Sequence, residues 1–273
     1  MIINEYELEK KWQSLTIRDN FIFSKTLESN PNLCKRLLEM ILNIKIKSLS
    51  YPEREKVLEA RTDSKGIRLD VYVEEEGGDR SFDIEMQITD SDNLAKRIRY
   101  YQGLIDMDKL KRGQPYKKLG ESFIIFICTF DRFGKGRHMY TFKETCAEVP
   151  NLLLGDGATK IFLNTKGKLD DVADDLKAFL DYVESGIVSG KFTEDFNETV
   201  QVVKSNRMAV KEFMTYEMTL IEREELGAIK KAEEIALNLI KMGFSYETIK
   251  EATKLPVRDI EELAEKSRES ESD

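Results

Sequence analysis

The strongest chemical signal in this sequence is a pair of carboxylates that a β-hairpin would bring together. Residues 67–73 and 81–88 both alternate apolar and polar side chains, and a Gly-Gly pair at 77–78 separates them as a favoured tight turn. With this turn, Asp70 faces Glu85 across the two strands, and the aliphatic side chains share the opposite face. A slip of one residue would mix polar with apolar side chains, so the pattern specifies this register.

Two carboxylates that face each other repel, and a bound divalent cation would convert that repulsion into a binding site. Oxygen ligands suit magnesium, calcium or manganese. The alternative is a hairpin face in solvent that carries acidic residues by chance, because the chain has Asp+Glu 51 against Lys+Arg 43. Spacing alone leaves both interpretations open.

The rest of the composition narrows the chemistry available to an enzyme. The single histidine, His138, disfavours a two-histidine metal site or a catalytic triad. Cys34, Cys128 and Cys146 form no CxxC pair, which disfavours a disulfide framework or a cysteine zinc site. The glycine patterns of dinucleotide-binding and P-loop sites are absent. Carboxylates, amides, hydroxyls, lysine and arginine remain, and they favour chemistry with a hard metal ion.

A basic stretch follows the hairpin within this acidic chain, whose formal net charge is −8. Basic residues beside a carboxylate-metal site suit a phosphodiester substrate, because they neutralise phosphates while the metal activates water. The alternative is an amphipathic helix with its charged side in water and Tyr100 or Tyr101 in the core, and for either tyrosine alone core packing is favoured. The basic residues are Lys96, Arg97, Arg99, Lys109, Lys111, Arg112, Lys117 and Lys118.

The pattern around the hairpin predicts an α/β core. Residues 4–15 and 31–43 have helical spacing, and a further helix is expected over 93–110. Residues 123–128 read as a strand buried on both faces, and 160–163 as another short strand.

The C-terminal part is helical and highly charged. Residues 207–241 predict one long helix, Ser245 can cap a following helix, and the last helix ends near Lys266. The terminal residues 267–273 are expected to be a disordered acidic tail.

The sequence therefore divides into a core at 1–168 and a helical extension at 169–273. With 41% hydrophobic residues, the chain can bury a substantial core. No apolar run is long enough to span a bilayer, and the charged N-terminus does not resemble a signal peptide. These features predict a cytoplasmic protein without a membrane segment.

Several short motifs occur in a characteristic order along residues 12–165. They are Leu15-Thr16-x-x-Asp19 with Phe21 and Phe23, then Asp70, Glu85-x-Gln87, Arg97-x-x-Tyr100-Tyr101 and Gly113-x-x-Tyr116-x-x-Leu119. As an ordered set, these motifs resemble the PD-(D/E)XK nuclease family transposases, which are the recombination-promoting nucleases or Rpn proteins. The resemblance implies a restriction-endonuclease-like core, in which a mixed sheet is flanked by helices and the central hairpin carries the active site.

The resemblance also implies residue roles. Asp70 and Glu85 would be the ligands of Mg2+, with Mn2+ as the alternative ion, and Arg97 would contact the scissile phosphate or its neighbour. Gln87 stands where the broader superfamily usually has lysine, so it can orient water but supplies neither a charge nor a titratable proton. Many such superfamilies add an acidic residue on the first core helix, for which Glu28 and Glu39 are both candidates.

The segment 236–256 is similar to the small helical end of many proteins in this family and has the pattern of a helix-turn-helix. Its charges are mixed and the following helix is acidic, so direct DNA reading has weak support. A protein–protein role, such as formation of a homo-oligomer through the long helix, is at least as well supported.

The leading hypothesis is a Mg2+-dependent DNA endonuclease of the Rpn type that hydrolyses phosphodiester bonds and promotes recombination. The competing hypothesis is a catalytically inactive binding or scaffold protein that keeps the nuclease fold. Gln87 and the net acidic charge motivate it, because a negative field opposes the approach of DNA.

Overall fold

The computed structural model describes residues 5–59 and 65–270, which form two compact units. The larger unit comprises Glu9–Val210, and the smaller unit joins the residues up to Leu8 with those from Lys211 onward. Within the described residues, no helix is long and apolar enough to cross a membrane.

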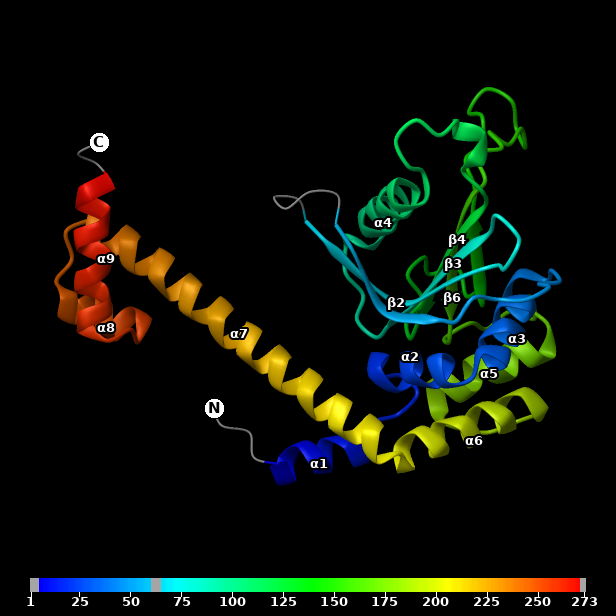
Figure 1. The fold of residues 1–273 in the computed structure, drawn as a ribbon, viewed down its shortest axis with the longest axis horizontal. Coiled ribbons are helices and arrows are strands. Elements are labelled where there is room, and N and C mark those ends of the chain that lie inside the picture. The colour runs from blue at the N-terminus through cyan, green and yellow to red at the C-terminus, as the bar shows by residue number, and fades with distance from the viewer. Residues whose placement is uncertain (1–4, 60–64, 271–273) are drawn as a thin grey trace. The chain divides into compact units, whose positions relative to one another are not determined.

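A mixed sheet forms the centre of the larger unit (Figure 1). In its described residues the strand order is β1-β2-β3-β4-β6-β5, with β1, β2 and β3 antiparallel, β3, β4 and β6 parallel, and β5 antiparallel to β6. The strands are β1 (Glu53–Leu58), β2 (Ile67–Glu74), β3 (Ser81–Gln87), β4 (Ser122–Cys128), β5 (Met139–Phe142) and β6 (Ala158–Asn164).

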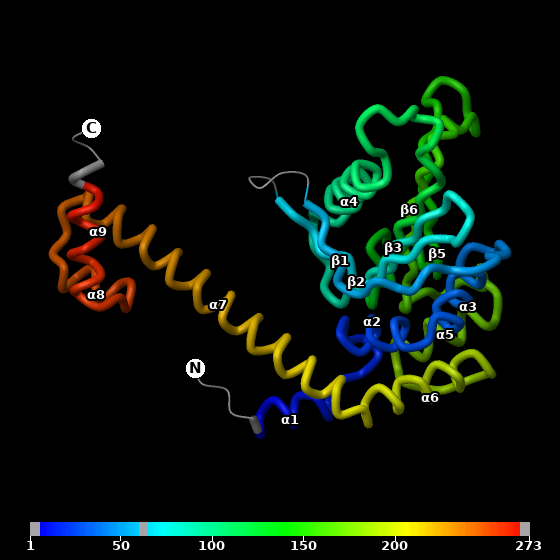
Figure 2. Tube along the Cα trace, in the orientation of Figure 1, coloured from blue at the N-terminus to red at the C-terminus, as the bar shows by residue number. Residues whose placement is uncertain are grey.

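Helices cover both faces of this sheet, as the ribbon and tube views show (Figures 1 and 2). One face carries α4, and α2, α3, α5 and α6 lie on the other side. The helices of this unit are α1 (Glu5–Ser14, shared with the smaller unit), α2 (Asn20–Ser29), α3 (Pro31–Leu42), α4 (Leu94–Lys109), the 3-10 turn η1 (Tyr116–Lys118), α5 (Asp174–Ser185) and α6 (Lys191–Ser205). This layering is the restriction-endonuclease-like fold that the sequence predicts.

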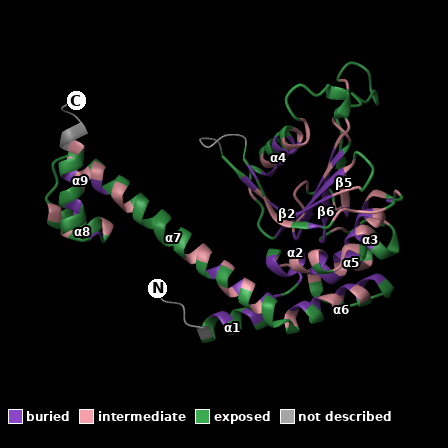
Figure 3. Ribbon diagram, in the orientation of Figure 1, coloured by how far each residue is buried: buried purple, intermediate pink, exposed green. Residues whose placement is uncertain are grey.

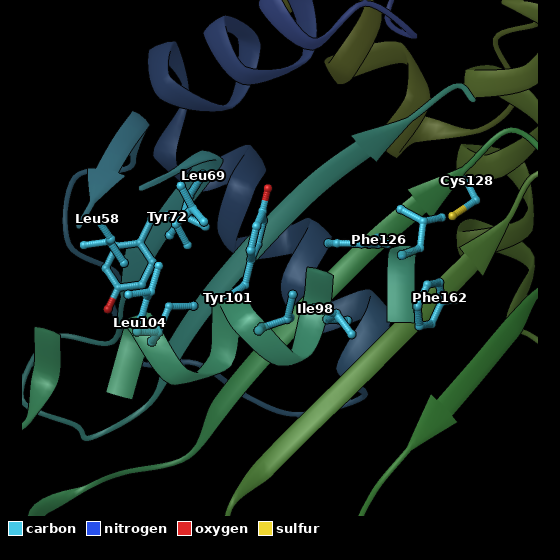
Figure 4. Close-up of a cluster of buried hydrophobic side chains, with 13 residues drawn as sticks. Leu58, Leu69, Tyr72, Ile98, Tyr101, Leu104, Phe126, Cys128 and Phe162 are labelled. Carbon is cyan, nitrogen blue, oxygen red and sulfur yellow. The ribbon is translucent and has the colours of Figure 1, made fainter. Parts of the chain in front are cut away.

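A hydrophobic cluster holds α4 against the sheet (Figure 4). Ile98, Tyr101 and Leu104 of the helix pack against strand residues that include Phe126 and Phe162. Tyr101 is buried, as core packing predicts, whereas Tyr100 is 39% exposed. Because α4 is fixed along its length, the side chains at its N-terminal end have a defined position relative to the strands.

The hairpin has the predicted register. Val71 pairs with Ile84, and Val73 pairs with Phe82, across antiparallel β2 and β3. Every residue of β3 is buried, including those on its polar face (Figure 3). A hairpin face in solvent is therefore excluded as the explanation of its acidic residues.

Helices α5 and α6 belong to the larger unit, which continues past the predicted boundary at residue 168 to Val210. Phe179, Phe192 and Phe196 form an aromatic cluster between the two helices. Arg36 of α3 forms an ion pair with Asp195 of α6 at 2.6 Å. These apolar and charged contacts attach residues 169–210 to the core.

The smaller unit contains most of α7 (Arg207–Lys241), with α8 (Tyr246–Thr253) and α9 (Val257–Ser270). Ala236, Ile249, Leu255 and Ile260 form its core, and Ser245 caps α8 by accepting a hydrogen bond from the Thr248 amide. Self-association through α7 stays a prediction; this helix exposes Leu226 and Ile229.

The prediction of a disordered tail from residue 267 is wrong for residues 267–270. Helix α9 continues to Ser270, because no proline or glycine interrupts the helix in this segment. Residues 271–273 lie outside the described residues.

One glycine before β4 is required by close packing. A Cβ atom at Gly120 would lie 1.8 Å from the backbone oxygen of Asp79, so Gly120→Ala must displace the main chain. We expect this substitution to lower the free energy of unfolding by about 1–3 kcal/mol, measured by urea denaturation. Gly103→Ala is the matched control, because nothing lies within 4 Å of its added Cβ and alanine favours the helix. Equal unfolding midpoints for the two variants would contradict this packing.

Candidate active site

The backbone ladder between β2 and β3 pairs Val71 with Ile84, and carboxylates take over the hydrogen bonding just beyond that pair. The Asp70 amide donates to Glu85 Oε1 at 2.8 Å, and the Met86 amide donates to Asp70 Oδ2 at 3.1 Å. Each carboxylate is thus bound to the main chain of the other strand. Asp70 is 9% exposed and Glu85 is 2% exposed. Asp70 and Glu85 therefore lie close together on adjacent strands, as the hairpin register predicts.

Two helices supply the remaining partners of this carboxylate pair. Asn20, the first residue of α2, donates from Nδ2 to Asp70 Oδ1 at 3.3 Å. Arg97, in the first turn of α4, donates from Nη2 to Glu85 Oε2 at 3.1 Å. All four carboxylate oxygens therefore accept one hydrogen bond, and each keeps a further lone pair.

Arg97 is held by aromatic rings as well as by Glu85. Its guanidinium lies 5.3 Å from the ring centroid of Tyr101 and 5.2 Å from that of Phe126. Its Nε is buried without a hydrogen-bond partner, while 31% of the side chain is exposed. The guanidinium is thus fixed beside the pair, with N–H groups left for another anion.

A third carboxylate, Asp83, lies on the same face of β3 as Glu85. It faces Tyr72 in the ladder, is fully buried, and neither of its oxygens has a hydrogen-bond partner. Burial and the negative charges of Glu85 and Asp70 hold the Asp83 pKa well above its usual range. Asp83 is not among the residues predicted for the site, although it occupies a polar position of the alternation.

The site concentrates more negative charge than its arginine offsets. Burial raises the pKa of Asp70, and hydrogen bonding from Met86 and the charge of Arg97 act against that rise. Burial and the charge of Asp70 raise the pKa of Glu85. The raised pKa values of both carboxyl groups indicate that added positive charge at this site would stabilise their ionised forms.

The donor set fits a hard divalent cation. In the described part of the chain, no group of three or more His, Cys, Asp or Glu side chains is arranged to hold a metal ion. Asp70 and Glu85 therefore offer two carboxylates to a cation, without a third ligand from these residue types among the described residues. Mg2+ usually binds in this way, through one or two carboxylates with water and substrate phosphates completing the shell.

Comparison with known proteins finds one family whose model matches part of the chain. Residues 20–150 match the family model of the PD-(D/E)XK nuclease family transposases. The similarity to this family thus covers residues 20–150, a little less than half of the chain. No curated protein and no solved structure matches the chain. The family assignment supports a nuclease function acting on DNA, and PD-(D/E)XK nucleases generally use divalent metals.

Gln87 ends β3 at the point where the broader PD-(D/E)XK superfamily usually has lysine. It is 8% exposed, and its backbone oxygen accepts a hydrogen bond from the Thr129 amide at 3.0 Å. Among the described residues, its side-chain amide forms no hydrogen bond, so both ends of the amide remain available to a ligand or water.

The structure brings neither candidate from the first core helices to Asp70 and Glu85. Glu28 forms an ion pair with Lys25 at 2.8 Å. Glu39 accepts a hydrogen bond from the Ile46 amide at 2.9 Å, which lowers the Glu39 pKa. Asn20 takes the place beside Asp70, and its position directly after the Leu15-Thr16-x-x-Asp19 motif is the signal that sequence reasoning missed.

The basic stretch of the nuclease domain does not form one surface at the carboxylates. Helix α4 connects parallel β3 and β4, so its two ends lie toward opposite edges of the sheet. Arg97 contacts Glu85 near the carboxyl end of β3, whereas Lys109 pairs with Glu74 at 2.6 Å beside the start of that strand. Arg97 therefore lies beside the carboxylates, and Lys109 lies away from them.

Proposed function

We propose that this protein is a divalent-metal-dependent DNA endonuclease of the recombination-promoting type. The observation that carries the proposal is the carboxylate pair of Asp70 and Glu85, buried at the hairpin within the PD-(D/E)XK nuclease domain. The hydrogen bonds that interlock the pair position four oxygen atoms without satisfying all their lone pairs.

In this proposal, Asp70 and Glu85 hold Mg2+, and Mn2+ can replace it. The bound ion supplies Lewis-acid stabilisation of the phosphoryl oxygens and lowers the pKa of water. Gln87 orients the attacking water through its amide, since its side chain is free to donate and accept. Arg97 binds a phosphate oxygen through the N–H groups that Glu85 does not use.

Arg97 also positions the carboxylate that it contacts. Its ion pair with Glu85 and its stacking on Tyr101 and Phe126 keep one Glu85 oxygen at a fixed place. The same guanidinium can therefore orient a metal ligand and neutralise substrate charge. This double role is available because arginine presents several donors in one plane.

Gln87→Ala is expected to lower the cleavage rate by roughly tenfold to a thousandfold while metal affinity stays nearly unchanged. The substitution removes an orienting amide but no ligand charge. Gln87→Lys restores the superfamily pattern and is expected to keep or raise activity. Cleavage rates and calorimetric Mg2+ titrations of the three proteins test this, and a parallel loss of rate and metal affinity would contradict the assigned role.

Conversion of supercoiled plasmid to nicked or linear DNA tests the proposed function. The wild-type protein is expected to cleave with Mg2+ and to stop when EDTA removes the metal. Asp70→Ala, purified in the same way, measures any contaminating nuclease and is expected to be inactive. Equal cleavage by both proteins would overturn the assignment, and no cleavage by the wild type with either ion would favour a nuclease fold that only binds.

A further inference from the structure

A pocket of about 660 Å3 opens beside the ends of two parallel strands of the larger unit. The loop after β4 and the segment after β6 form its walls. Its lining residues include three lysines and a single carboxylate, that of Asp131. The lysines are Lys135, Lys166 and Lys168.

The pocket lies at the same edge of the sheet as the candidate active site. Gln87, Cys128 and Asn164 end β3, β4 and β6 in one register row, and the pocket residues follow directly after the last two. The Thr129 amide of the pocket wall donates to the Gln87 backbone oxygen at 3.0 Å. Neighbouring strands are about 4.8 Å apart, so β6 lies about 10 Å from β3.

The lysine-bearing loop is organised before any ligand binds. Asp131 accepts hydrogen bonds from the amides of Gly134 and Gly136, at 3.1 and 2.8 Å, and from the Tyr140 hydroxyl at 2.8 Å. Burial acts to raise the Asp131 pKa, but these hydrogen bonds prevail and lower it. The Lys168 amide donates to the Gly136 oxygen at 2.7 Å and ties the two walls together. The one carboxylate of the lining is thus engaged within its own loop.

Two of the lysines carry charge that the surrounding protein does not neutralise. Lys166 forms an ion pair with Glu184. Lys135 and Lys168 are exposed, and neither has an ion pair within the described residues. In an acidic chain, two unpaired ammonium groups on a preorganised pocket favour an anionic ligand.

We propose that this pocket holds a backbone phosphate of the DNA strand that crosses the active site. The inference rests on the proposed endonuclease function. The pocket adjoins the ends of β4 and β6, and β6 lies about 10 Å from β3, so the bound phosphate lies within a few nucleotides of the cleaved bond. Phosphate contacts of this kind set the position of the substrate and carry no base preference.

DNA binding by the full chain tests the proposal, measured by fluorescence anisotropy of a labelled duplex in EDTA so that no cleavage occurs. The double variant Lys135→Ala/Lys168→Ala is expected to bind roughly tenfold more weakly near 0.15 M salt. The slope of log affinity against log salt is expected to become shallower by about one to two.

Lys117→Ala/Lys143→Ala is the matched control, because it removes the same charge near the opposite edge of the sheet, where β4 and β6 begin. It is expected to keep wild-type affinity and slope. Unchanged binding in the pocket variant, or an equal loss in the control, would overturn the proposal. The proposal would also be overturned if the pocket variant lost the binding of inorganic phosphate but kept wild-type binding of DNA.

The outcomes of these experiments distinguish a failure of the phosphate-site proposal from a failure of the endonuclease proposal. Cleavage by the wild type together with binding that does not depend on the pocket would overturn the phosphate site and leave the endonuclease standing. DNA binding that depends on the pocket, without cleavage in Mg2+ or Mn2+, would uphold the phosphate site and overturn the endonuclease.

Discussion

Replacing Asp70 with asparagine is expected to reduce DNA cleavage by at least about a thousandfold, since both ligand charge and site geometry are lost. Both Asp70 oxygens accept hydrogen bonds, one from the Met86 amide and one from Asn20. The amide nitrogen of asparagine would face the Met86 donor in one orientation, and in the other it would require Asn20 to turn its own amide. Initial rates of supercoiled plasmid loss, with thermal unfolding as a check on folding, measure the effect.

Asp83→Asn is the matched control for this variant. It makes the same chemical change on a neighbouring buried carboxylate whose oxygens have no hydrogen-bond partner. Asp83 is not part of the interlocked pair, so its variant is expected to retain cleavage within several-fold of the wild type. If both variants lost the same fraction of the cleavage rate, the total negative charge of the hairpin, rather than Asp70 itself, would determine that rate.

Glu85→Gln is expected to weaken Mg2+ binding by on the order of a hundredfold or more, because even changes to groups that only support a metal ligand cost tenfold to a hundredfold. The substitution removes a ligand charge and leaves Arg97 without its carboxylate partner. Calorimetric titration of the purified proteins measures the affinity directly. Gln87→Ala serves as the comparison, since it changes the same strand without removing a ligand.

A result in which Glu85→Gln and the wild type bind Mg2+ equally would contradict the assignment of Glu85 as a ligand. If Glu85→Gln and Gln87→Ala both kept full cleavage activity as well, the hairpin would be structural only.

The hairpin could be predicted from sequence because its information is local. Alternation on both strands fixes which residues share a face, and the apolar pairs Val71 with Ile84 and Val73 with Phe82 confirm the register. A slip would have buried polar groups in the core, at a large cost in free energy. The neighbourhood of Asp70 and Glu85 follows from this register.

The partners of the carboxylates could not be predicted in the same way, because they depend on tertiary packing. Asn20 reaches Asp70 from a helix fifty positions earlier, and only its place after the Leu15-Thr16-x-x-Asp19 motif points to that contact. Glu28 has the residue type expected on the first core helix, but Lys25 and Arg54 lie beside it. Residue type alone does not distinguish an acid at the site from an acid in a surface ion pair.

The extent of the core was underestimated for a related reason. Residues 169–210 have the helical, charged pattern of the C-terminal part, yet their apolar faces pack on α2 and α3. Phe179 and Phe196, both fully buried, show which faces these are. Helical periodicity predicts an apolar face but does not identify the surface that it covers.

Anomalous diffraction from crystals soaked in Mn2+ tests whether Asp70 and Glu85 share one divalent cation. We expect an anomalous peak contacted by carboxylate oxygens of both residues, and no such peak in Glu85→Gln crystals treated identically. An empty hairpin in the soaked wild-type crystals, or a peak that persists unchanged in Glu85→Gln, would contradict this expectation.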